Sequence, residues 1–255
     1  MSVERKLERP RGWAFSIAVP LLKPPLVLIG RRDWRHAERI PLTGGAVVAV
    51  NHISKIDPLM LSHLMYNYGR LPRFLAKDGL FKVKVLGGFL RAAGQIPVAR
   101  EGDDASVAFM AAVNAVKSGE AVMFYPEGSI TRDPDGWPMR GKTGAARVAL
   151  MSGAPVIPIG QWGAQETLPA YSGKPSLLPR HIAHYNVGDP VDLDDLRGKE
   201  ITSEVLQEAT DRIMAAITEL VAEIRGGEAP KERFDPRRAG LSEIGKITKV
   251  SEGDQ

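Results

Sequence analysis

The sequence predicts an α/β domain in which helices flank a mixed, largely parallel central sheet. Short valine-rich runs bounded by glycine, proline or aspartate recur along the chain, as is typical of buried strands. Helix-like stretches separate most of these runs, and this alternation favours parallel pairing. The length of 255 residues, with 44% hydrophobic and 25% charged, fits one globular core with appendages. Ligands of such sheets bind at strand ends, so we expect the functional site there.

An apolar run over residues 13–29 precedes the domain and has arginine and lysine residues on both sides. We interpret residues 1–40 as an amphipathic, membrane-seating helical segment at the interface, because basic residues beside an apolar run suit an anionic leaflet. Three prolines and Lys23 divide the run into two short pieces, so a spanning helix is not expected. No small-residue cleavage site follows, which argues against a signal peptide. The alternative is one more helix packed on the domain.

The elements of the domain, residues 41–225, follow from local patterns. Its strands are predicted at 45–51, 73–77, 95–99, 120–125, 155–160 and 181–187. Its helices are predicted at 58–67, 104–117, 143–152 and 202–225. We expect the second helix to bury Val107, Met110, Val113 and Val116, and the last helix to bury Leu206, Ala209, Ile213, Ile217, Leu220 and Ile224. Residues 226–255 are polar and charged and are predicted to form a flexible tail.

Composition excludes several classes of function. The chain has no cysteine, so disulfides, thiolate metal sites and acyl-cysteine chemistry are excluded. His181 and His184 are three residues apart in a strand, which points them to opposite faces, and we expect no metal. No P-loop and no serine nucleophile elbow occurs. Residues 1–188 carry ten more basic than acidic residues, which indicates that an anionic ligand or surface contacts this part.

The loop after the first strand holds a candidate catalytic pair. His52 and Asp57 are five residues apart, and Pro58 suits the first turn of a helix that Asp57 would cap. A loop of this length can fold the imidazole back onto the carboxylate, and a histidine held in this way is a general base near neutral pH. A capping aspartate beside an incidental histidine explains the same spacing.

Further polar residues follow other predicted strands. Residues 127–129 would bring backbone amides and a hydroxyl to the sheet edge that holds His52. Arg100 ends another strand, and its guanidinium matches a phosphate group. Arg140 and Lys142 precede a helix, where two cations also suit an anion. Each of these signals is weak alone.

Four segments taken in order carry a specific resemblance: NHISKID, GQIPVAR, YPEGS and VIPIG. They resemble the four motifs of the glycerolipid O-acyltransferase family, the PlsC-like 1-acyl-glycerol-3-phosphate acyltransferases. The similarity covers residues 45–160, and the N-terminal segment resembles the membrane-seating piece of that family. The resemblance implies the glycerolipid acyltransferase fold and favours a catalytic role for the histidine and aspartate.

The resemblance also implies a role for each matching residue. His52 matches the base that deprotonates the acceptor hydroxyl, and Asp57 matches the carboxylate that orients this base. Lys77 resembles a lysine that follows the first motif in relatives, and we expect it to polarise the thioester carbonyl. The residues implied in binding or supporting the acceptor are Asn51, Ser54, Arg100, Glu127, Gly128, Ser129, Arg132 and Lys142.

One motif departs from the family pattern. Relatives commonly read Glu-Gly-Thr-Arg-Ser, whereas this chain reads EGSITR, so its arginine is displaced to Arg132. Either Arg132 reaches back, or Arg140 and Lys142 supply the charge, or the headgroup is not a bare phosphate monoester. The departure concerns the identity of the acceptor more than the type of reaction.

The resemblance implies transfer of a fatty acyl group to lysophosphatidic acid, giving phosphatidic acid in phospholipid synthesis. The donor is an acyl-CoA or acyl carrier protein thioester, whose good leaving group makes a covalent enzyme intermediate, a cofactor or a metal unnecessary. We expect a peripheral, monotopic enzyme on anionic lipids at the cytoplasmic face of the cell membrane. No nucleic acid is expected as a partner. The alternatives are another acceptor, such as a lysophospholipid or a glycosylated phosphoinositide, and a non-catalytic module that binds anionic lipid.

Overall fold

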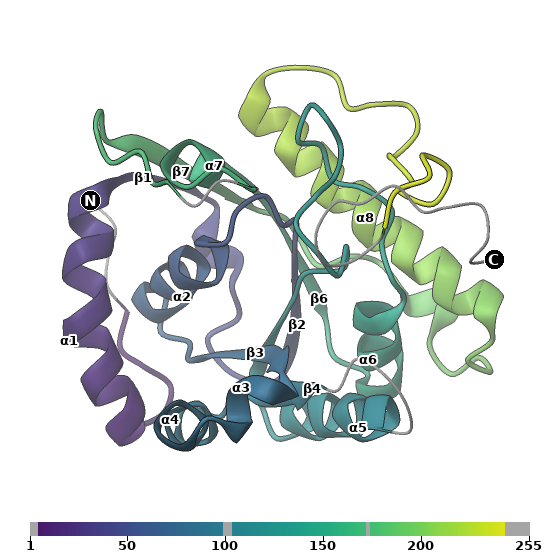
Figure 1. Ribbon diagram of the computed structural model, residues 1–255. Coiled ribbons are helices and arrows are strands. Elements are labelled where there is room, and N and C mark those ends of the chain that lie inside the picture. Colours follow the sequence, from purple (N-terminus) through teal and green to yellow (C-terminus); the bar gives the residue numbers. More distant parts are fainter. Residues whose placement is uncertain (1–4, 99–103, 172–173, 243–255) are drawn as a thin grey trace.

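The computed structural model describes residues 5–98, 104–171 and 174–242. A seven-stranded sheet with the order β1-β7-β6-β2-β5-β3-β4 runs through this part of the chain (Figure 1). Its neighbouring strands are parallel, apart from the antiparallel pair β6 and β7. The predicted mixed, largely parallel sheet is therefore confirmed. The strands are β1 (Gly30–Arg35), β2 (Ala46–Val50), β3 (Pro72–Lys77), β4 (Ile96–Val98), β5 (Ala121–Phe124), β6 (Val156–Trp162) and β7 (His181–Val187).

Helices cover both faces of the sheet, and alternate residues of the central strand divide the core in two. Val47 and Ala49 of β2 pack with α5, α6 and α8, whereas Val48 and Val50 pack with α2 on the other face (Figure 1). The helices are α1 (Gly12–Ile29), α2 (Asp57–Asn67), α3 (Asp78–Lys82), α4 (Lys84–Ala92), α5 (Asp104–Lys117), α6 (Gly144–Ser152), α7 (Ala164–Thr167) and α8 (Ser203–Arg225), with 3-10 turns η1 (Ala37–Arg39) and η2 (Asp194–Leu196).

The N-terminal apolar run forms one continuous helix, α1, and the prediction of two short pieces was wrong. Pro20, Pro24 and Pro25 all lie inside it. Each proline removes one backbone hydrogen bond, but α1 packs against α2 and α4 and leads directly into β1, and these contacts keep it helical. By length and composition alone, α1 is able to cross a membrane.

Strand β1 lies within the segment that was predicted to precede the domain. Its residues pair in parallel with β7, from Gly30 beside His181 to Arg35 beside Asn186. The sheet therefore begins at residue 30, and the predicted boundary after residue 40 is too late. The charged sequence GRRDWR lacks the apolar alternation of a half-buried strand, and it forms one edge of the sheet.

Helix α5 buries only part of the face that was predicted to pack on the core. Val107 and Met110 are 65% and 46% exposed, while Ala112, Val113 and Val116 are buried. A helix has roughly 3.6 residues per turn, so side chains three residues apart differ in direction by about 60° around the helix axis. Over nine residues this drift places Val107 opposite Val116, so the two cannot share a buried face. In contrast, α8 buries its predicted stripe against the sheet as far as Leu220.

Candidate active site

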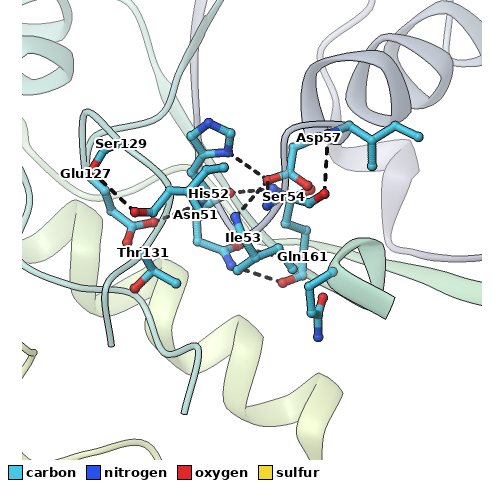
Figure 2. A network of polar contacts seen from close by, with 12 residues as sticks. Asn51, His52, Ile53, Ser54, Asp57, Glu127, Ser129, Thr131 and Gln161 are labelled. Atoms are coloured by element: carbon cyan, nitrogen blue, oxygen red, sulfur yellow. Dashed lines mark hydrogen bonds and ion pairs between the residues drawn. The ribbon is translucent and has the colours of Figure 1, made fainter. Parts of the chain in front are cut away.

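His52 and Asp57 form a hydrogen-bonded pair at the carboxyl end of β2. The Nδ1 atom of His52 lies 2.8 Å from Oδ2 of Asp57, and the same oxygen accepts the backbone amides of Ile53 and Ser54 at 2.7 and 2.8 Å (Figure 2). Asp57 was predicted to cap α2, but this prediction was wrong. Ile56 holds the N-cap position, and the Asp57 carboxylate turns back into the loop. The loop between strand and helix is thus folded around this carboxylate.

The environment of the pair fixes the state of the imidazole. Asp57 is fully buried, and burial raises the pKa of its carboxyl group, while hydrogen bonds from His52, Ser54 and Ile53 oppose the rise. Oδ2 already accepts two backbone amides, so its contact with Nδ1 favours the imidazole tautomer that carries the proton on Nδ1, which leaves the Nε2 lone pair available. The imidazole stacks on Tyr125, with ring centroids 4.2 Å apart, and is 17% exposed. An imidazole held in this way can act as a general base.

Glu127 joins the His52 loop to a second loop. Its side chain is buried, with Oε1 accepting the His52 amide at 2.7 Å and Oε2 accepting the Met139 amide at 3.0 Å. Thr131 completes the frame, because its amide donates to the His52 carbonyl at 2.7 Å. Burial raises the pKa of Glu127 to about 8. The carboxyl ends of β2 and β5 therefore meet as predicted, and Glu127 joins them by accepting backbone amides. Its role in acceptor binding stays a prediction.

Gly128 and Lys142 lie against each other beside Glu127. Gly128 has φ +74°, and a Cβ atom there would lie 3.1 Å from side-chain carbons of Lys142. A side chain at position 128 would therefore be strained and would crowd the lysine. The Lys142 amide donates to the Pro126 carbonyl at 2.8 Å, which fixes this approach. Ser129, the next residue, is half-buried, and its hydroxyl donates to the Ile130 carbonyl.

Asn51 and Ser54 hold the loop from inside the protein, and their part in substrate binding stays a prediction. Both are fully buried. The Asn51 carboxamide accepts the Gln161 amide at 2.8 Å and donates to the Gln161 carbonyl at 3.0 Å, which ties β2 to β6 (Figure 2). The Ser54 hydroxyl donates to the Leu168 carbonyl at 2.6 Å. These polar groups are engaged with backbone, so the two residues position the catalytic loop.

Three other predicted residues lie away from the pair or outside the described residues. Arg132 is buried, and its guanidinium donates to the Ser242 hydroxyl at 3.1 Å, so it is directed to the chain's C-terminal part. Lys77 is exposed at the end of β3, and no polar contact joins it to His52 or Asp57 within the described ranges. Arg100 lies outside the described residues.

A cavity of about 220 Å³ opens beside Glu127 and Lys142. Two segments far apart in sequence enclose it, the loop before α6 and residues 235–237. The part of the predicted tail that the structure describes therefore packs on the domain, which sequence reasoning missed because this stretch has no periodic apolar pattern. The lining residues are Glu127, Met139, Arg140, Gly141, Lys142, Thr143, Gln207, Asp235, Pro236 and Arg237.

The two histidines of β7 have local partners. His184 Nδ1 lies 2.9 Å from Asp33 on β1, and His181 contacts Glu166 and Ser176. Among the described residues, no group of three or more His, Asp or Glu side chains is arranged to hold a metal ion. These histidines therefore serve to join β7 to its neighbours.

Comparison with known proteins agrees with this geometry. The acyltransferase family model matches residues 31–162. The 1-acyl-sn-glycerol-3-phosphate acyltransferase of Bacillus subtilis (strain 168) is 29% identical over 205 residues, covering 78% of this chain and 94% of the relative. The chloroplastic 1-acyl-sn-glycerol-3-phosphate acyltransferase BAT2 of Brassica napus is 32% identical over 144 residues, covering 56% of this chain, which spans only 40% of that relative's length.

A solved structure shares the fold. The crystal structure of the 1-acyl-sn-glycerophosphate acyltransferase PlsC from Thermotoga maritima matches with a TM-score of 0.61 at 21% identity, covering 85% of this chain and 81% of that one. The family model spans more than half of the chain and includes the loop that holds His52 and Asp57. The chain therefore belongs to the acyltransferase family.

Proposed function

We propose that this chain transfers a fatty acyl group from an acyl-CoA or acyl carrier protein thioester to the free hydroxyl of lysophosphatidic acid. The observation that carries the proposal is the His52 and Asp57 pair, in which Nδ1 lies 2.8 Å from a buried carboxylate oxygen, an arrangement that leaves Nε2 to take a proton. The relatives named as 1-acyl-sn-glycerol-3-phosphate acyltransferases support the choice of substrate.

The reaction follows from this geometry. The acceptor hydroxyl oxygen attacks the thioester carbonyl carbon while Nε2 of His52 takes the hydroxyl proton. The tetrahedral intermediate then expels the thiolate, which receives that proton from the imidazolium, so the ester forms as the thioester breaks. Asp57 stabilises the imidazolium and holds the ring in place, and base catalysis of this kind contributes about 10²- to 10⁴-fold in rate. Lys77 remains our candidate for polarising the carbonyl.

The acceptor phosphate requires cations near His52. The Lys142 side chain lies against Gly128, the residue that follows Glu127, and Glu127 accepts the His52 amide. Arg140 lies on the same loop as Lys142, before α6. We propose that these two residues contact the headgroup, together with Arg100 and the Ser129 hydroxyl. We leave Arg132 out of this set, since its side chain is buried and its guanidinium contacts Ser242.

We place the enzyme on the cytoplasmic surface of the cell membrane, as a monotopic protein. Helix α1 exposes Trp13, Ile17, Leu21 and Leu28, and α3 and α4 with the residue between them expose Leu80, Val83, Val85 and Leu86. The two regions adjoin, because Trp13 packs edge-on against Phe89 of α4 with centroids 6.0 Å apart (Figure 1). A contiguous apolar surface of this kind, accompanied by Lys23, Lys82 and Lys84, suits a headgroup boundary. Helix α1 packs against α2 and α4, so it lies along the domain, as a monotopic arrangement requires.

A second candidate is acylation of a different lipid headgroup. The observation that favours it is the contact of Arg132, because the arginine that the family motif offers to a phosphate monoester is displaced in this chain and contacts Ser242. A lysophospholipid or a glycosylated phosphoinositide would then be the acceptor. Both candidates use the same base and the same donor.

An acceptor panel tests the proposal. Thiol release from palmitoyl-CoA, and from palmitoyl acyl carrier protein, is measured with lysophosphatidic acid, lysophosphatidylcholine or a glycosylated phosphoinositide. We expect the highest kcat/KM with lysophosphatidic acid and phosphatidic acid as the product. Preference for either of the other lipids would favour the second candidate, and release that is independent of every acceptor would contradict both.

A further inference from the structure

The C-terminal segment, residues 233–242, is anchored across the loop that precedes α6. The Arg140 amide donates to the Phe234 carbonyl at 2.9 Å, and the Arg140 guanidinium contacts the Asp235 carboxylate at 3.1 Å. Arg132 donates to Ser242 at 3.1 Å at the far end of the segment. Arg233 pairs with Asp211 of α8 at the near end. The segment, yellow in Figure 1, is thus held at its start, over residues 233–235, and at its end.

The cavity that this segment encloses is positively charged. Arg140, Lys142 and Arg237 line it, and its two acidic residues, Asp235 and Glu127, each have partners at the cavity wall. Asp235 contacts Arg140 and accepts the Arg237 amide at 2.9 Å, while each Glu127 oxygen accepts a backbone amide. Roughly 10–15 Å³ of such volume holds one water, so the cavity of about 220 Å³ is large enough for a polar headgroup.

The cavity adjoins the catalytic loop through one side chain. Glu127 lines the cavity and at the same time fixes the His52 amide at 2.7 Å. An anion held between Lys142 and Arg237 is therefore placed next to the backbone that carries the base. The displaced arginine also acquires a role here, since Arg132 anchors the C-terminal segment through Ser242.

We propose that the C-terminal segment forms one wall of the acceptor-headgroup site and that Arg237 binds the anionic headgroup together with Lys142. This inference rests on the proposed function and deepens it by adding a residue from the opposite end of the chain. The charge that the motif arginine would supply is provided by Arg237, whose guanidinium matches a phosphate group.

The chain offers a matched pair of variants. Arg237 and Arg238 are adjacent and both exposed, yet only Arg237 lines the cavity. Arg237→Gln is expected to raise the acceptor KM about tenfold, as expected for a lost charge-assisted hydrogen bond, and to leave the donor KM unchanged. Arg238→Gln is expected to match the wild type in both constants. Equal acceptor KM values for the two variants would overturn the inference.

A binding measurement separates this inference from the proposed function. Calorimetry with short-chain lysophosphatidic acid below its micellar concentration, without donor, is expected to give about tenfold weaker binding for Arg237→Gln than for Arg238→Gln. If the wild type binds the lipid with this difference but releases no thiol, the proposed function fails and the anionic site stands. If the wild type binds no better than Arg237→Gln, the inference fails whatever the activity.

A third variant tests the wall itself. Ser242→Ala removes the hydroxyl that the Arg132 guanidinium contacts and leaves every cavity cation in place. We expect a higher acceptor KM, because the anchor of the segment is weakened, with an unchanged donor KM. An acceptor KM equal to that of the wild type would show that the anchor does not shape the site and would remove Arg132 from the inference.

Discussion

Oδ2 of Asp57 accepts three hydrogen bonds, and one of them holds Nδ1 of His52 at 2.8 Å. The other two come from the backbone of the loop that carries the histidine, so the carboxylate folds the loop and orients the base at the same time. Because the aspartate is fully buried, solvent does not compete for these bonds. The geometry is therefore set before any substrate binds.

Asp57→Asn tests the orientation of the base. Because His52, Ile53 and Ser54 all contact the same oxygen, a carboxamide has two options. It can keep its oxygen at the Oδ2 position, as a neutral partner that stabilises the imidazolium less than a carboxylate does, or it can turn its NH₂ group toward Nδ1, which removes the acceptor of both amides and favours the tautomer with the proton on Nε2. We expect kcat to fall about 10²- to 10⁴-fold. The matched control is Asp33→Asn, because Asp33 holds His184 at 2.9 Å on the edge of the sheet. Equal kcat values for the two variants, measured by thiol release, would count against the assignment.

Glu127 gives stability a defined dependence on pH. Its pKa is about 8 in the folded protein, compared with 4.5 for an ordinary glutamate. Between these values the unfolded chain releases the proton and the folded chain keeps it, so the free energy of unfolding falls as pH rises, by up to about 1.4 kcal/mol per pH unit. Glu127→Gln should flatten this decrease between pH 5.5 and 7.5, measured by urea unfolding. The exposed-site variant Glu228→Gln serves as the control, and a wild-type slope no steeper than that of Glu127→Gln would refute this reading.

Asn51→Ala tests whether Asn51 positions the loop or binds substrate. The substitution leaves the buried amide and carbonyl of Gln161 without their side-chain partner, which we expect to cost about 1–3 kcal/mol in the free energy of unfolding. The acceptor KM should stay unchanged well below the melting temperature. Asn114→Ala, at an exposed site on α5, should change stability by less than about 0.5 kcal/mol. A tenfold rise in the acceptor KM without loss of stability would show that Asn51 binds substrate.

The apolar surface on α1 and α4 predicts how the protein binds membranes. Leu21→Glu and Val85→Glu place a charge on residues that are 68% and 87% exposed, and both should weaken sedimentation with anionic phospholipid vesicles. Ser203→Glu adds the same charge to the exposed start of α8, on the other side of the sheet (Figure 1), and should leave binding unchanged. If Val85→Glu behaves like Ser203→Glu, α4 does not contact the membrane.

The sequence predicts the centre of the fold and of the site well. Parallel strands bring their carboxyl ends to one edge, so NHISKID after β2 and YPEGS after β5 had to meet once the strands were identified. The contact between the His52 amide and Glu127 is the result. Short apolar runs and motif order suffice for this part, because both are local patterns.

Features that depend on tertiary packing were not predictable in this way. The prolines of α1 indicate a broken helix, but packing on α2 and α4 keeps it continuous. The charged strand β1 is paired only because β7 offers it an edge. Likewise, nothing local in the polar tail indicates that Arg237 would lie beside Lys142, which is 95 residues earlier in the chain. Such contacts are specified by the assembled fold.

The measurement that tests the account most directly is thiol release from palmitoyl-CoA by detergent-solubilised protein, with and without lysophosphatidic acid. Wild type, His52→Ala and the control His184→Ala are compared, and the lipid product is identified by mass spectrometry. We predict acceptor-dependent release and phosphatidic acid with wild type and His184→Ala, and loss of both with His52→Ala. Release that needs no acceptor and survives His52→Ala would identify a thioesterase activity and would contradict His52 as the base of an acyl transfer.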